Sequence, residues 1–168
     1  FETITVTAGA ASNMVITTSN ENATASQSLT VNASALTNAS AALDFTSGET
    51  GTGESQATVN VTGGAGADTM TGGTEYSNFT GGANADVFEI ASGNLTSNDT
   101  LSGGDGTDII QISDASTVVD ADFKNVTGFE TLKSGLTNGA QTITLGSLAD
   151  AAGLATITGN GTGVDTIT

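Results

Sequence analysis

Hydrophobic and polar residues alternate in short runs along the first third of the chain. The segment Thr3-Ile4-Thr5-Val6-Thr7 is one such run, and its β-branched residues suit the pleated surface of a β-strand. Helical periodicity is absent at any useful length. The pattern therefore predicts an all-β chain, with strands near residues 2–7, 14–18, 28–32, 42–46 and 56–62.

A second pattern, rich in glycine and aspartate, follows in residues 63–111. The nine-residue motif Gly-Gly-x-Gly-x-Asp-x-U-x, in which U is a large apolar residue, is complete at 63–71 and 103–111. The copy at 81–89 departs from the motif only at Asn84, and the copy at 160–168 only at its first residue. Residues 72–80 and 94–102 are degenerate copies. The apolar U positions predict a common core column of Met70, Phe79, Phe88, Leu101 and Ile110.

Each motif combines a tight turn with a carboxylate. Its glycines adopt backbone angles that other residues disfavour, so carbonyl oxygens point inward beside the aspartate at position six. Calcium takes six to eight oxygen ligands in a relaxed geometry, so two such turns can share one ion. Magnesium would need a stricter octahedron, and zinc would need the His or Cys that the sequence lacks.

The spacing of the aspartates predicts how the turns stack. Asp68 and Asp86 are eighteen residues apart. Asp86 and Asp108 are twenty-two apart, which keeps the register if residues 90–93 form a four-residue insertion. We expect these three aspartates to lie in line on one side of a coil, with two well-formed calcium sites between them.

The opposite side of the predicted coil is poorer in carboxylates. It offers Ser77 where the motif has aspartate, with Glu75 and Asn78 nearby, and then Asp99. At most one weak site is expected there. Asp165 would form half of a further site. The predicted metal ligands are Gly63, Gly64, Ala65, Gly66, Asp68, Gly81, Gly82, Ala83, Asn84, Asp86, Asp99, Gly103, Gly104, Asp105, Gly106, Asp108, Gly161, Gly163 and Asp165.

The net charge of the chain restricts its function and partners more than its hydropathy does. Eighteen carboxylates face two lysines, which gives a formal net charge of −16. A chain of this charge repels itself unless cations lie among the carboxylates. The charge argues against nucleic acid as a partner and against an anionic membrane surface, and no apolar run is long enough to insert into a membrane.

The residue types that the sequence lacks exclude several kinds of function. Without His or Cys, the familiar nucleophilic triads cannot form, so we expect no enzyme activity. Without Cys, disulfides cannot stabilise a secreted chain, and metal is the expected substitute. The sequence has neither an initiator Met nor a signal peptide, and we expect it to be part of a longer protein.

The glycine–aspartate motifs resemble those of the RTX (repeats-in-toxin) calcium-binding family. That resemblance implies a right-handed parallel β-roll or β-solenoid stabilised by several Ca²⁺ ions. It also implies type I secretion and folding outside the cell, where calcium is abundant.

Within that family the chain is most like surface-layer (S-layer) proteins of Gram-negative bacteria. This likeness rests on Thr- and Ser-rich strands joined to the motifs, and on the segment 101–108 followed by 128–132. It implies self-association into a lattice on the bacterial cell surface, with cell-surface polysaccharide as a possible partner of regions outside this chain. The alternatives are a segment of a large RTX adhesin, or the C-terminal RTX part of a secreted enzyme or toxin.

Four regions are expected. Residues 1–62 form a Thr- and Ser-rich solenoid segment, 63–111 the calcium-binding roll, and 112–128 a connecting segment. Residues 129–168 begin a second unit, because Phe129-Glu130-Thr131-Leu132 repeats Phe1-Glu2-Thr3-Ile4.

Overall fold

The protein was analysed as a computed structural model that describes residues 2–6, 12–19, 27–48, 57–114, 117–134, 140–159 and 166–168. Within these residues the chain is almost entirely β, and every strand pairing is parallel. The predicted all-β parallel architecture is therefore confirmed.

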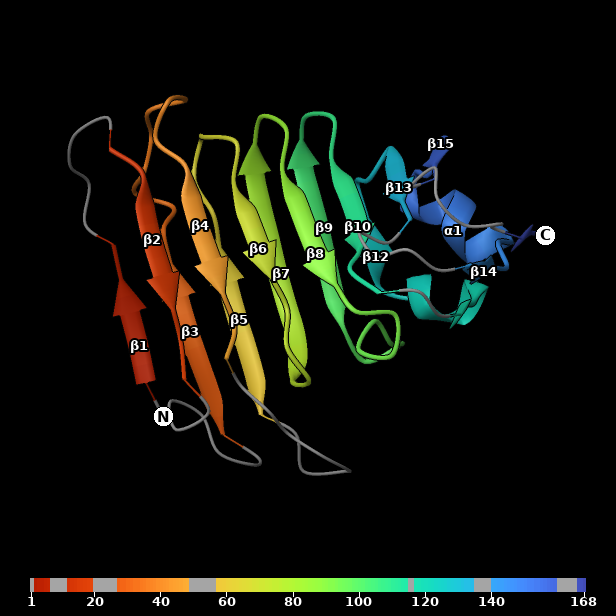
Figure 1. The fold of residues 1–168 in the computed structure, drawn as a ribbon. Helices are drawn as coiled ribbons and strands as arrows, with labels where there is room; N and C mark the ends of the chain where they lie inside the picture. Colours follow the sequence, from red (N-terminus) through yellow and green to blue (C-terminus); the bar gives the residue numbers. More distant parts are fainter. Residues whose placement is uncertain are drawn as a thin grey trace.

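Up to residue 112, successive strands alternate between two parallel sheets, which Figure 1 shows as two layers running from the red end of the chain to the green. This alternation winds the chain as a solenoid, because each pair of strands makes one coil. The first sheet contains β1 (Glu2–Thr5), β3 (Ser28–Asn32), β5 (Thr58–Thr62), β7 (Tyr76–Ala83), β9 (Thr100–Asp105) and β12 (Val126–Thr127). The second contains β2 (Met14–Thr17), β4 (Leu43–Thr46), β6 (Thr69–Thr71), β8 (Val87–Ile90), β10 (Ile109–Ile112), β13 (Thr131–Lys133) and β15 (Thr156–Thr158).

The five strands expected before residue 63 are present as β1 to β5, within two residues of the expected bounds wherever those bounds are described. Two short helices and a small sheet were not expected. The helices are η1 (Asp120–Phe123) and α1 (Ser147–Ala152), and the sheet joins β11 (Thr117–Val118), β14 (Thr142–Ile143) and β16 (Thr166–Ile167). In the described part of the chain neither helix is long enough to cross a membrane.

The core lies between the two sheets, and one prediction about it was wrong. The U residues do not form one column. Met70, Phe88 and Ile110 align on the second sheet, whereas Phe79 and Leu101 align on the first. The reason is the alternation of strands, which sends consecutive motifs to opposite walls of the coil.

The two walls meet through aromatic rings. Phe79 lies between Phe45 and Phe88 in edge-to-face contacts, with ring centroids 5.8 and 6.0 Å apart. Phe88 makes a third such contact with Phe129 at 5.0 Å. All four rings are fully buried, so this chain of aromatic contacts links residues of three coils through the core.

Candidate metal centre

Asp68, Asp86 and Asp108 occupy the same corner of three successive coils and form what we call the aspartate column. Oδ1 of Asp86 accepts a hydrogen bond from the backbone N–H of Asp68, eighteen residues earlier, at 2.7 Å. Oδ1 of Asp108 accepts one from the N–H of Asp86, twenty-two residues earlier, at 2.8 Å. The predicted alignment of the three aspartates is confirmed. The insertion was expected at residues 90–93 but does not begin at residue 90, because Ile90 ends β8 and pairs with Ile112 in the ladder.

The strands hold the column in place. Each aspartate immediately precedes a strand of the second sheet, β6, β8 or β10. The ladder extends into the corner, because the N–H of Val87 bonds to the carbonyl of Asp68 and the N–H of Ile109 to that of Asp86, both at 2.9 Å. The three carboxylates are at most 1% exposed.

The outer oxygens of this column are only partly satisfied. Oδ2 of Asp68 accepts a hydrogen bond from the N–H of Gly64 at 2.7 Å. Oδ2 of Asp86 and Oδ2 of Asp108 are buried and accept none. A buried carboxylate oxygen without a hydrogen-bond partner destabilises the folded protein. A positive group beside these two atoms would remove that penalty.

The first glycine of each motif brings a second oxygen to the same place. A Cβ at Gly81 would overlap both Oδ2 of Asp86 and the carbonyl oxygen of Gly103. A Cβ at Gly103 would likewise overlap Oδ2 of Asp108 and the carbonyl oxygen of Gly128. At each level, therefore, a carboxylate oxygen and a carbonyl oxygen of the next coil approach one glycine. Both groups are hydrogen-bond acceptors, so a cation or a proton beside them would offset their repulsion.

These oxygens suit a hard cation such as Ca²⁺. Carboxylate and backbone carbonyl oxygens are ligands that calcium accepts, and the chain has no His or Cys to favour a softer metal. Among the described residues no three acidic side chains converge on one point. Backbone carbonyls and water would therefore supply most of the ligands, and calcium would supply the positive charge that the column lacks.

Burial also changes the acidity of the column. It raises the pKa of Asp86 to about 7, and the charges of Asp68 and Asp108 add to the effect of burial. Burial raises the pKa of Asp68 and of Asp108 as well, and Glu130 and Asp105 add to the shift of Asp108. Without a cation, the column therefore favours protonation.

The second glycines stack closely from coil to coil. Gly82 and Gly104 have φ values of 127° and 110°, which side chains rarely adopt. A Cβ on Gly82 would overlap the carbonyl oxygen of Gly64, and one on Gly104 that of Gly82. Gly82 and Gly104 were predicted as metal ligands. In the structure their lack of a side chain lets successive turns approach closely, so they set the spacing between turns.

Asn84 stands where the motif has glycine, and its backbone is left-handed at φ 72°. Asparagine tolerates this conformation better than most residues. Its Nδ2 donates to the carbonyl oxygen of Ala65 at 2.6 Å. The amide thus bridges two turns, and it uses a carbonyl that we had expected to face a metal.

The remaining predicted residues fall into three groups. A Cβ on Gly66 or on Gly106 would overlap a carbonyl oxygen of the preceding coil. Ala83 and Asp105 are paired at the ends of β7 and β9, where Asp105 is exposed. Gly161, Gly163 and Asp165 lie outside the described residues.

Asp99 lies at the opposite corner of the coil, as expected. Its Oδ1 accepts a hydrogen bond from the N–H of Ser77 at 2.8 Å. Its Oδ2 accepts one from the N–H of Thr96 at 2.7 Å and another from Oγ1 of Thr96 at 3.0 Å. This carboxylate is thus well supplied with donors.

Glu130 is a member of the column that sequence reasoning missed. Its Oε2 accepts a hydrogen bond from the N–H of Asp108, twenty-two residues earlier, at 2.7 Å. The column is therefore one coil longer than expected. The spacing between Asp86 and Asp108, applied once more, would have found it.

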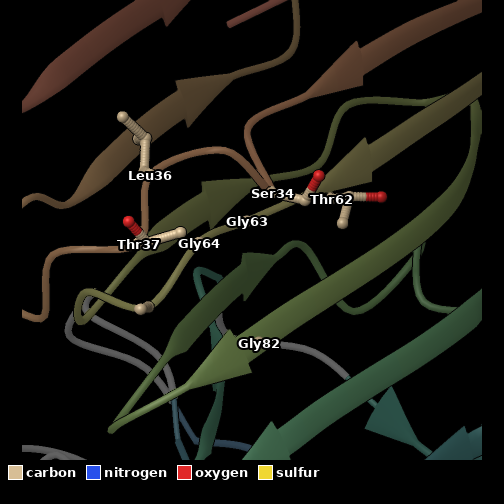
Figure 2. A pocket seen from close by; sticks show the side chains of 8 residues that line it. Ser34, Leu36, Thr37, Thr62, Gly63, Gly64 and Gly82 are labelled. Atoms are coloured by element: carbon tan, nitrogen blue, oxygen red, sulfur yellow. The ribbon is translucent and has the colours of Figure 1, made fainter. Parts of the chain in front are cut away.

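A separate pocket of about 270 Å³ lies beside the first turn (Figure 2). It is lined by Ser34, Leu36, Thr37, Thr62, Gly63, Gly64, Ala65 and Gly82. Its lining contributes hydroxyls, the side chains of Leu36 and Ala65, and backbone groups, but no carboxylate. It adjoins the column, because the N–H of Gly64 bonds to Oδ2 of Asp68.

Comparison of the chain with protein-family models, with curated proteins and with solved structures gave no match in any of the three.

Proposed function

We propose that this chain is a calcium-binding structural segment of a secreted bacterial cell-surface protein of the RTX type. The observation that carries the proposal is the aspartate column. Its buried, unpartnered carboxylate oxygens at Asp86 and Asp108 recur with the coil, and each lies near a carbonyl oxygen of the next coil. Calcium bound there would offset charge repulsion and join neighbouring turns.

Folding and calcium would be coupled in such a segment. A chain with a net charge of −16 and buried carboxylates is destabilised when no cation is present. Calcium is scarce inside cells and near millimolar outside them, so the segment would fold after export. This proposal assigns the chain no catalytic activity.

Calorimetric titration with calcium tests the column. We expect the change Asp86→Ala to remove more bound calcium than the change Asp99→Ala. Asp86 lies between two neighbouring turns of the column, whereas Asp99 belongs to a corner with one pair of carboxylates. Far-UV circular dichroism in chelator and in calcium would report whether each variant folds. Equal losses of calcium in the two variants would contradict the column as the principal site.

Within this function, an S-layer protein is the version we favour. The Thr- and Ser-rich strands of β1 to β5 continue the solenoid well beyond the motifs, which an enzyme tail does not need. Electron microscopy of the protein with calcium should show ordered sheets that disperse on chelation. Isolated rods that stiffen in calcium would instead favour an adhesin.

A further inference from the structure

The outer face of the first sheet has a regular pattern of uncharged polar side chains. Along its strands, residues buried in the core alternate with residues that point outward. The parallel register aligns these outward residues from strand to strand in two rows. The first row contains Thr3, Thr30, Asn60, Asn78 and Thr100. The second row contains Thr5, Asn32, Thr62, Thr80, Ser102 and Thr127.

Both rows lack charged side chains, although the chain as a whole has a net charge of −16. The outer face of the second sheet differs, because Asp44, Glu89 and Lys133 lie there on β4, β8 and β13. The neutral face is therefore a property of the first sheet and not of both walls. A neutral polar ligand can approach this face, whereas the net charge of the chain would repel a polyanion.

The amides of the first row are held in place by hydrogen bonds. Nδ2 of Asn78 donates to Oδ1 of Asn60 at 2.8 Å, and Nδ2 of Asn60 donates to the carbonyl oxygen of Leu29 at 3.3 Å. The strands that carry the rows lie about 4.7–4.9 Å apart, as in any sheet. Because these donors and acceptors are positioned before a ligand arrives, binding would cost little conformational entropy in the protein.

Tyr76 adds an aromatic ring to the same face. It is half-buried and lies on β7 two residues before Asn78, so the alternation of the strand directs its side chain outward. The other aromatic rings of the described residues are phenylalanines that are at most 1% exposed. Within the described part of the chain, Tyr76 is therefore the one aromatic ring that reaches the surface. A tyrosine ring combines an apolar face with a polar tip.

We propose that the outer face of the first sheet binds an extended, neutral polysaccharide that lies across the strands. Sugar hydroxyls both donate and accept hydrogen bonds, as do the Thr, Ser and Asn side chains of the two rows. The C–H face of a sugar ring suits the ring of Tyr76. A sugar unit in an extended β-linked chain is close in length to the strand spacing of about 4.7–4.9 Å, so successive sugars meet the same row on successive strands. This binding goes beyond the proposed calcium function and uses no residue of the aspartate column.

The experiment is affinity electrophoresis of the full chain in native gels that contain calcium and one polysaccharide. The neutral probes are glucomannan, galactomannan and xyloglucan, and the anionic comparison is hyaluronan. We expect at least one neutral probe to retard the wild type, and hyaluronan to leave its mobility unchanged. The dependence of mobility on the concentration of the probe gives the affinity.

Three variants locate the binding. Tyr76→Ala should lower the affinity about tenfold, because the sugar ring loses its aromatic contact. Thr80→Lys should abolish retardation, because Thr80 is exposed in the second row and the long lysine side chain would block that row. Thr17→Lys is the matched control, because Thr17 is an exposed threonine on β2 of the second sheet. It changes the net charge equally and should be retarded as the wild type is. Far-UV circular dichroism in calcium reports whether each variant folds.

Several results would overturn the proposal. Wild-type protein that none of the neutral probes retards would do so, and this result needs no variant to fold. Retardation by hyaluronan as strong as by the neutral probes, or equal retardation of Thr80→Lys and Thr17→Lys, would also contradict it. A wild type that light scattering shows to be a dimer without polysaccharide, beside a monomeric Thr80→Lys, would assign the face to a second copy of the chain. Failure of the calcium proposal would look different, because calorimetry would then detect no bound calcium whatever the gels show.

Discussion

At the scale of single residues, the structure shows acidic side chains with two functions at once. Oδ1 of Asp86 accepts a hydrogen bond from the N–H of Asp68. The side-chain oxygen thus takes the place of a backbone carbonyl as the acceptor for this N–H. The other oxygen, Oδ2, is buried without a donor and lies near the carbonyl of Gly103. The hydrogen bond of Oδ1 holds neighbouring turns together. The unpartnered Oδ2 is the atom that a cation would stabilise.

The variant Asp86→Asn separates these functions. Its amide keeps an oxygen for the N–H of Asp68 and places an N–H₂ donor beside the carbonyl of Gly103. We expect the calcium-free protein to gain about 1–3 kcal/mol of stability, because a buried unpartnered acceptor is removed. The extra stability that calcium gives should shrink. Chemical denaturation in chelator and in calcium measures both, and a variant as calcium-dependent as the wild type would contradict the assignment.

The acidic residues also show what a motif can and cannot predict. The spacing of Asp68, Asp86 and Asp108 was sufficient to predict their alignment, because coil length fixes which residues stack. Glu130 and the buried position of Glu75 were missed, because neither residue occupies position six of a motif. Which carboxylate oxygens lack a donor depends on side-chain direction, and no spacing encodes that.

At the scale of elements, short alternating runs were enough to predict the first five strands. Such runs suit a sheet with one face in the core, so tertiary packing reinforced the local preference. Helix α1 was missed because its six residues carry no periodic signal. Asp120 supports it from 26 to 29 residues away by accepting hydrogen bonds from the N–H groups of Gly146, Leu148 and Ala149. A contact of this range is not visible in local sequence.

The turns place a strict limit on side-chain size, which Gly81→Ala tests. The added methyl would overlap Oδ2 of Asp86 and the carbonyl of Gly103, so the coils would have to separate. We expect a loss of about 1–3 kcal/mol or more in saturating calcium, measured by denaturant unfolding. Gly93→Ala is the control, because nothing lies within 4 Å of that Cβ. Its effect should stay within about 0.5 kcal/mol. Similar losses in both variants would argue against close packing at the turn.

At the scale of the whole molecule, negative charge opposes folding. The column and the opposite corner bury five acidic groups at most 2% exposed: Asp68, Glu75, Asp86, Asp99 and Asp108. Either protons or cations can relieve this charge, and they compete for the same oxygens. This competition gives the fold a pH dependence whose sign differs with and without calcium.

In chelator, the protein should be more stable in mild acid than at neutral pH. The pKa of Asp86 is raised from 3.8 to about 7 in the fold, so its stabilising contribution is complete below pH 3.8 and is lost as the pH rises through about 7. Asp68, Asp99 and Asp108 shift in the same direction. Thermal unfolding at about pH 5 and about pH 7.5 measures the difference. Calcium needs the ionised form, so its affinity should fall in acid. Greater stability at neutral pH in chelator would contradict this account.

The most direct test of the aspartate column is a crystal structure grown in calcium, with the ions located by anomalous scattering. The account predicts peaks in a row beside Asp68, Asp86 and Asp108, between the turns at 63–68, 81–86 and 103–108, with the unpartnered Oδ2 atoms as ligands. A structure with the same two sheets and the same register, but with no peak between these turns, would contradict it.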